Sequence, residues 1–219
     1  MNELEKLENF VNDQIDIISK GLEYTKEQSD NIDIAIDQIV SGNFKSTKDI
    51  GDALEHLIAK IFEVHKLYFI KQNLRTKTNE IDLFIELSEK GYFYRSRLYP
   101  SLPKKFLVEC KNYNETVGVT YVGKFYSLMN VSNTNNGIFI SKKGLTGNPD
   151  SWSDSKGLVK KIALKNNCFI LDFDLSELKN LKGKHLNKML SDKLNCLKLD
   201  VSFEKFIKPH ELENSLKDA

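Results

Sequence analysis

The chain has 219 residues, of which 40% are hydrophobic and 29% are charged, and its formal net charge is +1. This size and composition are typical of one globular domain with a substantial core, and they exclude a disordered chain. No apolar run reaches the roughly 20 residues of a membrane span, and the acidic start MNELEKLENF does not resemble a signal peptide.

The near-neutral total charge conceals two oppositely charged parts. Residues 1–40 contain ten acidic residues and three lysines, a balance of −7, so the remaining residues carry +8. An acidic helical segment beside a basic body differs from a uniformly neutral protein, and nucleic acid therefore stays open as a partner. An ordinary solvated helix face is the alternative interpretation of the acidic segment.

The three cysteines are widely spaced and include no CxxC pair. They are Cys110, Cys168 and Cys196. The first two lie in apolar runs, and no histidine stands at zinc-ligand spacing from any of them. We therefore expect three reduced, buried thiols in a cytoplasmic protein, without a structural zinc site.

Hydrophobic spacing predicts two helices near the N-terminus, at about residues 4–18 and 32–40, before a break at Gly42. Together they predict an antiparallel helical hairpin, which we take as an acidic N-terminal arm over residues 1–46. The arm is interpreted as a structural appendage, and a homodimer interface is the sharper alternative.

The rest of the chain alternates helical and extended patterns. A helix capped by Ser46 or Thr47 is expected through residue 67. The segments expected after it are extended 68–74, strand 80–87, strand 106–111, helix 120–131, strand 137–141, helix 156–167, strand 168–173 and a helical region from 174. This order predicts an α/β fold with a central mixed sheet flanked by helices, over a core at 47–180. Residues 181–219 are assigned to a helical or extended C-terminal tail.

Three charged residues on neighbouring expected strands carry the chemistry. Glu109 and Lys111 are two positions apart in FLVECK, so their side chains share one face, and Asp82 lies on the preceding strand. Charges in so apolar a run are costly to bury without partners. Two carboxylates can share a hard divalent cation, and a lysine beside them can position a water for phosphodiester hydrolysis. A structural ion-pair cluster is the alternative.

Two further glutamates lie close to this group in the pattern. Glu55 borders the apolar stripe of the preceding helix and is a candidate fourth member, whereas an exposed glutamate paired with Lys60 is the alternative. Glu80 precedes Asp82 by two residues and either joins the ligands or marks the strand edge.

The segments GDALEHLIAKIFEV, EIDLFIEL, FLVECKNY, VGVTYVGKFYSLM and GIFISKKGLT, in this order, resemble the PD-(D/E)xK nuclease superfamily, and its Mrr-type restriction endonuclease branch in particular. The resemblance implies a restriction-endonuclease-like core and an Mg²⁺-dependent DNA endonuclease, with Mn²⁺ as a substitute ion. It makes Asp82, Glu109, Lys111 and Glu55 catalytic, and it makes the three carboxylates among them the metal ligands.

The sequence also departs from this family pattern. Glu80 stands where the glycine of a Gly-x-Asp motif is commoner, and the first 46 residues are too few and too acidic for a separate DNA-reading domain. Target choice would then belong to a partner protein or to the insert at residues 88–105.

Several basic and aromatic residues are candidates for contact with nucleic acid. In the insert, arginines alternate with tyrosines, a composition that suits phosphates and bases, although an extended β-hairpin with packed rings is the alternative. Elsewhere a helix and a lysine-rich loop after a strand offer further contacts, with solvated helix faces as the alternative. The predicted contact residues are Arg95, Arg97, Tyr121, Lys124, Lys142 and Lys143.

The sequence thus supports two functions of different classes. The first is a metal-dependent nuclease, a DNA endonuclease of restriction or anti-phage defence, with RNA as the less favoured substrate. The second is a catalytically inactive nuclease fold that binds nucleic acid or assembles a complex.

Overall fold

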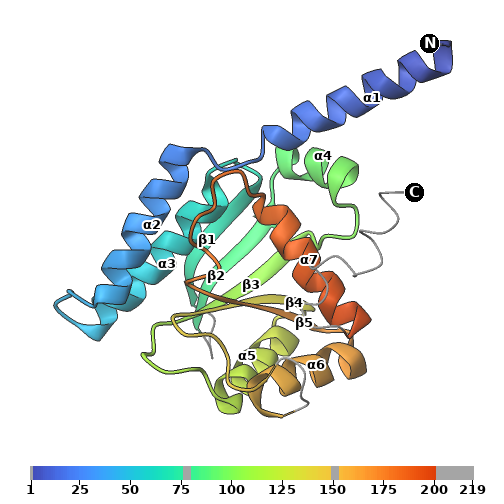
Figure 1. Cartoon of the computed structure of the whole chain (residues 1–219). Coiled ribbons are helices and arrows are strands. Elements are labelled where there is room, and N and C mark those ends of the chain that lie inside the picture. The colour runs from blue at the N-terminus through green and yellow to red at the C-terminus, as the bar shows by residue number, and fades with distance from the viewer. Residues whose placement is uncertain (1, 76–79, 149–152, 201–219) are drawn as a thin grey trace.

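The computed structural model describes residues 2–75, 80–148 and 153–200. In these ranges a mixed sheet has the strand order β1-β2-β3-β4-β5, in which β1, β2 and β3 are antiparallel neighbours and β3, β4 and β5 are parallel (Figure 1). The strands are β1 Tyr68–Arg75, β2 Glu80–Leu87, β3 Lys105–Lys111, β4 Asn136–Ser141 and β5 Phe169–Asp174.

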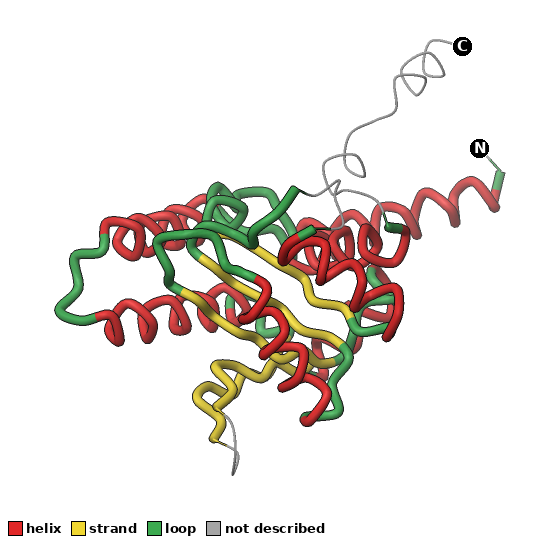
Figure 2. Tube along the Cα trace, turned by 90° about the horizontal axis from the view of Figure 1, so that it is seen from below, coloured by secondary structure: helices red, strands yellow, loops and turns green. Residues whose placement is uncertain are grey.

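Helices cover both faces of this sheet, as Figure 2 shows from below. They are α1 Glu3–Lys20, α2 Lys26–Ser41, α3 Thr47–Glu63, α4 Glu89–Leu98, α5 Val119–Val131, α6 Asp154–Asn166 and α7 Leu186–Leu199. One core joins the sheet to α2, α3 and α7, and a second joins it to α5 and α6. The predicted α/β fold, a mixed sheet flanked by helices, is therefore confirmed.

Local capping explains where the helices begin and end. Ser46 accepts a hydrogen bond from the Asp49 backbone, as expected for the cap of α3. Helix α2 ends at Gly42, whose φ of +71° lies in the left-handed region that favours glycine. Helix α6 ends at Asn166, and the next residue, Asn167, lies in the left-handed region at φ +50°.

The two faces of the sheet pack through alternating strand residues. Leu83 and Ile85 of β2 are fully buried in the core beneath α3. On the other face, the Phe139 ring of β4 packs edge-on against Phe125 of α5, with centroids 5.7 Å apart. Gly137 permits this approach, because a Cβ there would lie 2.7 Å from the Phe125 ring.

The predicted N-terminal hairpin is wrong, although both of its helices form. Helix α2 packs against α3, whereas α1 projects from the body (Figure 1). The reason is tertiary: Ile32 and Ile36 of α2 find a partner in α3, and the segment before α2 is fixed to the body. There the buried Tyr24 hydroxyl donates to the Ile61 carbonyl at 2.8 Å.

The insert and the last helix also differ from expectation. Residues 88–105 contain helix α4 and no β-hairpin, because Ser88 caps this helix by accepting from the Gly91 backbone. The helical region expected from residue 174 starts at Leu186, since the Asp174 carboxylate accepts from the Ser176 backbone and holds a turn.

The domain prediction places one boundary near each end of the chain. Helices α2 and α7 share the core of the sheet, while the division at residues 46 and 180 stays a prediction. Residues 201–219 of the predicted tail lie outside the described residues. In the described part of the chain, no helix is both long and apolar enough to cross a membrane.

Candidate active site

The charged residues predicted to act together meet at one edge of the sheet. Strands β2 and β3 are antiparallel, and the pairing of Leu83 with Val108 sets the start of β2 beside the end of β3. The Cys110 backbone N–H donates to Oδ2 of Asp82 at 2.7 Å. Glu109 and Lys111, on either side of Cys110, form an ion pair through Oε1 and Nζ.

Helix α3 adds Glu55 to this group. Its Oε2 atom is buried and has no hydrogen-bond partner among the described residues. Burial, followed by the charge of Asp82, raises the pKa of Glu55 to about 7. The charges of Asp82, Glu55, Glu109 and Lys111 all act on the Cys110 thiol, so the four predicted catalytic residues lie in one neighbourhood.

The electrostatics of the site show a surplus of buried negative charge. Burial raises the pKa of Asp82 despite its bond from Cys110, and burial together with Asp82 raises the pKa of Glu109. Burial alone would lower the pKa of Lys111, but Glu109 and Asp82 outweigh it and raise that pKa, so the ammonium stays charged. One lysine thus faces three carboxylates that favour neutralisation.

The donor chemistry of the site fits a hard divalent cation. Carboxylate oxygens are the ligands that Mg²⁺ and Mn²⁺ prefer, and a cation would satisfy the unpaired Glu55 oxygen and offset the repulsion that raises these pKa values. Within the described ranges, no three such side chains already surround a common point. Asp82 is engaged by Cys110 and Glu109 by Lys111.

Four predicted nucleic-acid contacts lie beside this edge. The Lys142 backbone donates to the Lys111 carbonyl at 3.2 Å, so the loop after β4 continues next to the end of β3. Lys143 follows it and is exposed. On α5, Nζ of Lys124 lies 5.7 Å from the centre of the Tyr121 ring.

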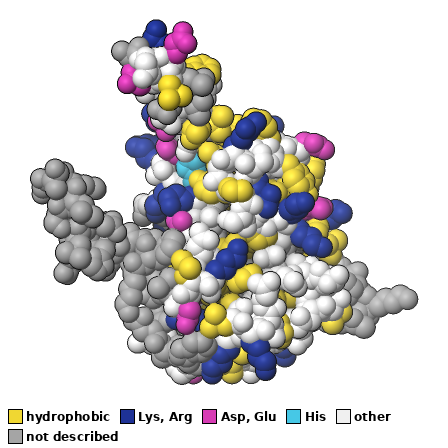
Figure 3. All heavy atoms as spheres, turned by 90° about the vertical axis from the view of Figure 1, so that its right-hand side faces the viewer, with side chains coloured by type: hydrophobic (Ala, Val, Ile, Leu, Met, Phe, Trp, Pro, Cys, Tyr) yellow, Lys and Arg dark blue, Asp and Glu magenta, His cyan; other side chains and the backbone are white. Residues whose placement is uncertain are grey.

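Arg95 and Arg97 lie at the other end of the strands, on α4. Asp82 and Ser88 are six positions apart, about 20 Å along the strand direction of β2, so the structure does not bring these arginines to the catalytic group. Figure 3 shows lysines and arginines spread over the face that includes α4 and α7. There a shallow pocket of about 360 Å³ has a basic lining of Arg95, Lys104, Lys105 and Lys198. Nucleic-acid contact at Arg95 and Arg97 stays a prediction.

Two residues near the site were not singled out from the sequence. Asp52 precedes Glu55 by three residues on α3 and is among the charges that raise the Glu55 pKa. Tyr113 follows Lys111 by two residues and is acted on by the Lys111 and Glu109 charges. Helical spacing from Glu55, and an aromatic residue directly after the E-x-K strand, are the signals that would have found them.

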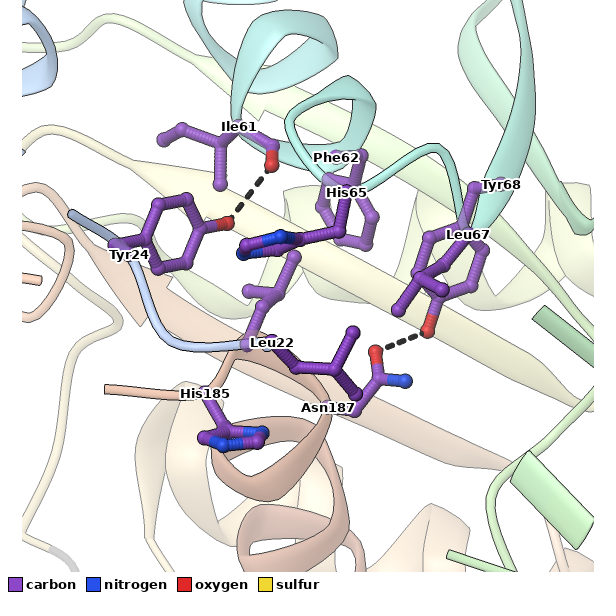
Figure 4. Close-up of a pocket in the computed structure, with 10 residues that line it drawn as sticks. Leu22, Tyr24, Ile61, Phe62, His65, Leu67, Tyr68, His185 and Asn187 are labelled. Atoms are coloured by element: carbon purple, nitrogen blue, oxygen red, sulfur yellow. Dashed lines mark hydrogen bonds between the residues drawn. The ribbon is translucent and has the colours of Figure 1, made fainter. Parts of the chain in front are cut away.

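A separate enclosed cavity of about 10 Å³ lies between α3, α7 and the segment before α2 (Figure 4). Its volume suits about one water molecule. Nε2 of His65 and Nδ2 of Asn187 are buried at this cavity without a partner among the described atoms, while the Asn187 oxygen accepts from Tyr68 at 2.6 Å. A bridging water is the simplest way to satisfy both nitrogens, which gives the cavity a structural role.

We expect His65 to destabilise the fold as the pH falls. Burial, followed by the charge of Lys90 and of His185, lowers the His65 pKa from 6.5 to about 4. Between these values the unfolded chain binds a proton at His65 that the folded chain does not, so the contribution of His65 to stability declines below pH 6.5 and levels off near pH 4. Between pH 6.5 and pH 4, the free energy of unfolding in urea should fall by roughly 1–2 kcal/mol more for the wild type than for His65→Gln. Parallel stability curves for the two proteins would contradict this expectation.

Comparison with known proteins identifies the family of this chain. A restriction endonuclease family profile (Mrr_cat) matches residues 50–166, which include all four predicted catalytic residues. Among solved structures, the DNA modification-dependent restriction endonuclease AspBHI matches with a TM-score of 0.42 and 12% identity, over 83% of this chain and 42% of that one. The chain thus spans less than half the length of that protein. No curated protein matches. The resemblance drawn from the sequence is confirmed: the chain belongs to the restriction endonuclease family, and the matched domain is of the PD-(D/E)xK type.

Proposed function

We propose that this chain is a divalent-metal-dependent endonuclease that cuts DNA. The observation that carries the proposal is the convergence of Asp82, Glu109, Lys111 and Glu55 around Cys110, at one edge of the sheet. Family membership supplies the reaction class, and the surplus of buried carboxylates supplies the need for a cation.

Each residue of the site has a distinct part in this proposal. Asp82, Glu109 and Glu55 would hold Mg²⁺, with Mn²⁺ as a substitute. When bound, the ion supplies Lewis-acid polarisation of the phosphate and stabilises the leaving oxygen. Lys111 keeps its proton, orients the attacking water and offers positive charge to the phosphate oxygens. The Cys110 N–H fixes the Asp82 carboxylate, which holds its free oxygen toward the ligand site.

The test of this function is cleavage under controlled metal. Purified full-length chain should nick or cut plasmid DNA in Mg²⁺ or Mn²⁺, and it should be inactive in EDTA. Parallel reactions on RNA of the same sequence separate the two substrates. A chain that cuts neither nucleic acid in either metal would refute the proposed function and favour the inactive binding module.

The biological setting follows from the family and remains part of the proposal. We infer a role in restriction or anti-phage defence, with a partner protein that supplies target choice, and a cytoplasmic location in keeping with three free cysteines. Phage should form fewer plaques on cells that express the wild-type chain than on cells that express Lys111→Ala. Equal plating on both would contradict the defence role.

We further propose that α1 pairs with the α1 of a second copy. Leu4, Phe10 and Ile17 of this projecting helix are 64%, 61% and 63% exposed, and its polar residues gather on the opposite face. Burial of an apolar helix stripe that has no partner among the described residues is favourable when two copies bury it together.

Removal of residues 2–20 should convert a dimer to a monomer in light scattering. The change also removes five acidic residues and two lysines, so nonspecific DNA binding should strengthen and depend more steeply on salt. Phe10→Asp should break the dimer as well, whereas Asn12→Ala on the polar face should not. The longer deletion of residues 1–40 is unsuitable because it removes Ile36 from the core. A wild-type chain that is monomeric at high concentration would contradict the pairing.

A further inference from the structure

A pocket of about 410 Å³ opens directly beside the catalytic group. It is lined by Tyr121 and by the loop of residues 113–118, which follows the end of β3. Its volume lies in the range of roughly 300–1,000 Å³ that is usual for small-molecule sites. Lys111 and Glu109 both act electrostatically on Tyr113, so the pocket adjoins the site of the proposed cleavage.

The floor of this pocket is held in place from two sides. The buried Val117 donates its N–H to the Gly144 carbonyl at 2.9 Å and accepts from the Thr146 N–H at 3.0 Å. Its carbonyl also accepts from the Ser155 hydroxyl at 2.7 Å. The loop is thus anchored by a parallel bridge to the segment after β4, and the pocket is formed before any ligand arrives.

Two tyrosines form the aromatic wall. The rings of Tyr113 and Tyr121 have centroids 5.1 Å apart and planes tilted by 54°. The Tyr121 side chain is the largest influence on the pKa of Tyr113 and raises it, in keeping with the closeness of the two rings. Tyr113 is nevertheless 40% exposed, so its ring is not consumed by packing and remains available to a flat ligand.

Charged and polar groups surround this wall: Glu115 lines the pocket itself, and two lysines lie beside it. Nζ of Lys142 donates to Oδ1 of Asn114 at 2.9 Å, and Lys124 lies over the Tyr121 ring. Helix α5 starts at the rim behind Gly118 without a side-chain cap, so its first backbone donors face the same region. An aromatic wall flanked by lysines is the arrangement that binds a base together with its neighbouring phosphates.

We propose that this pocket holds one unpaired nucleobase of the DNA that crosses the catalytic edge, stacked on Tyr113 and Tyr121. Its flanking phosphates then lie at Lys111, Lys124 and Lys142. A paired base inside a duplex has both faces covered by its neighbours, whereas an unpaired base has a free face and leaves the stack at lower cost. The proposal rests on the proposed function and narrows it to DNA with an unpaired nucleotide near the cut.

The test measures binding in EDTA, so that cleavage plays no part. Three probes are used: a duplex with one extra unpaired adenine, the same duplex with an abasic residue in its place, and the fully paired duplex. Wild-type chain should bind the unpaired adenine about 5- to 150-fold more tightly than the other two, which is the contribution of one stacked base. An unpaired 2-aminopurine at the same position should lose fluorescence on binding.

Three variants assign the effect to the pocket. Tyr113→Ala should abolish the preference while leaving affinity for the paired duplex within twofold, and Tyr113→Phe, which keeps the ring, should retain it. Tyr92→Ala is the matched control, because Tyr92 is also 40% exposed but lies on α4. The comparison of adenine with the abasic residue uses unaltered protein, so it holds even where a variant misfolds.

The outcomes separate the pocket from the nuclease. The pocket is refuted when wild type binds all three probes alike, binds the abasic probe as tightly as adenine, or fails to bind DNA, and equally when Tyr113→Ala keeps the preference. Cleavage without base preference leaves the proposed function intact. Base preference in a chain that never cuts DNA refutes the nuclease and retains the pocket.

Discussion

Replacement of Lys111 by alanine is expected to slow DNA cleavage by about 100- to 1,000-fold, the usual cost of removing one positioned group that stabilises charge in the transition state. Lys111 is the cation of the site, held by its ion pair with Glu109 and kept charged by Glu109 and Asp82. Without it, the attacking water loses its orientation and the phosphate oxygens lose a positive partner. Initial rates on supercoiled plasmid in saturating Mg²⁺ measure the effect.

The matched control is Lys161→Ala, which removes an exposed lysine from α6. This variant should cut at the wild-type rate and unfold at the wild-type temperature, whereas Lys111→Ala should unfold below it because the Glu109 carboxylate loses its partner. Cleavage is therefore compared at a temperature at which both variants are folded. Cleavage by Lys111→Ala at more than a tenth of the wild-type rate would contradict the role given to this lysine.

Asp82→Asn is expected to abolish cleavage and yet to raise the melting temperature in EDTA by about 2–4 °C, the shift that roughly 1 kcal/mol produces in a domain of this size. The Asp82 pKa is raised by burial, so its ionised carboxylate opposes folding at neutral pH. Asparagine removes that charge, and its side-chain oxygen can still accept from the Cys110 N–H. Stability and activity therefore move in opposite directions at this position.

Metal provides the second half of this experiment. Mg²⁺ should raise the melting temperature of the wild type and leave that of Asp82→Asn unchanged, because the variant lacks one charged ligand. Asp172→Asn, at another half-buried strand aspartate, is the control and should respond to Mg²⁺ as the wild type does. Equal stabilisation of all three proteins would remove Asp82 from the proposed metal site.

Much of the local structure could be predicted because its causes are local. Ser46 caps α3 and Asn167 ends α6. Serine offers a side-chain acceptor and asparagine tolerates the left-handed region, so residue type alone favours a helix end at each position. The catalytic group was also predictable in part. The position of Glu109 relative to Lys111 follows from strand alternation, and their order after Asp82 follows the family pattern.

The remaining features depended on partners distant in the sequence. The spacing in residues 4–18 correctly predicts a helix. That α2 packs on the body while α1 projects from it depends on the contact of α2 with α3, which the spacing does not reveal. The composition of the insert did not distinguish a helix from a hairpin, and Ser88 favoured the helix. Arg95 and Tyr113 are both of residue types that suit contact with nucleic acid. The direction of the strands places Arg95 far from Asp82 and Tyr113 beside it.

By itself, then, the sequence determined which residues carry charge, which segments are helical or extended, and which family order they follow. Only the tertiary structure decided that Glu55 from α3 meets Asp82 and Glu109 with a buried oxygen left unpaired. It also decided that Val117 anchors the loop that forms the tyrosine pocket. The physical reason is that hydrophobic period and capping act over a few residues, whereas burial, repulsion between carboxylates and strand pairing arise only when distant segments are brought together.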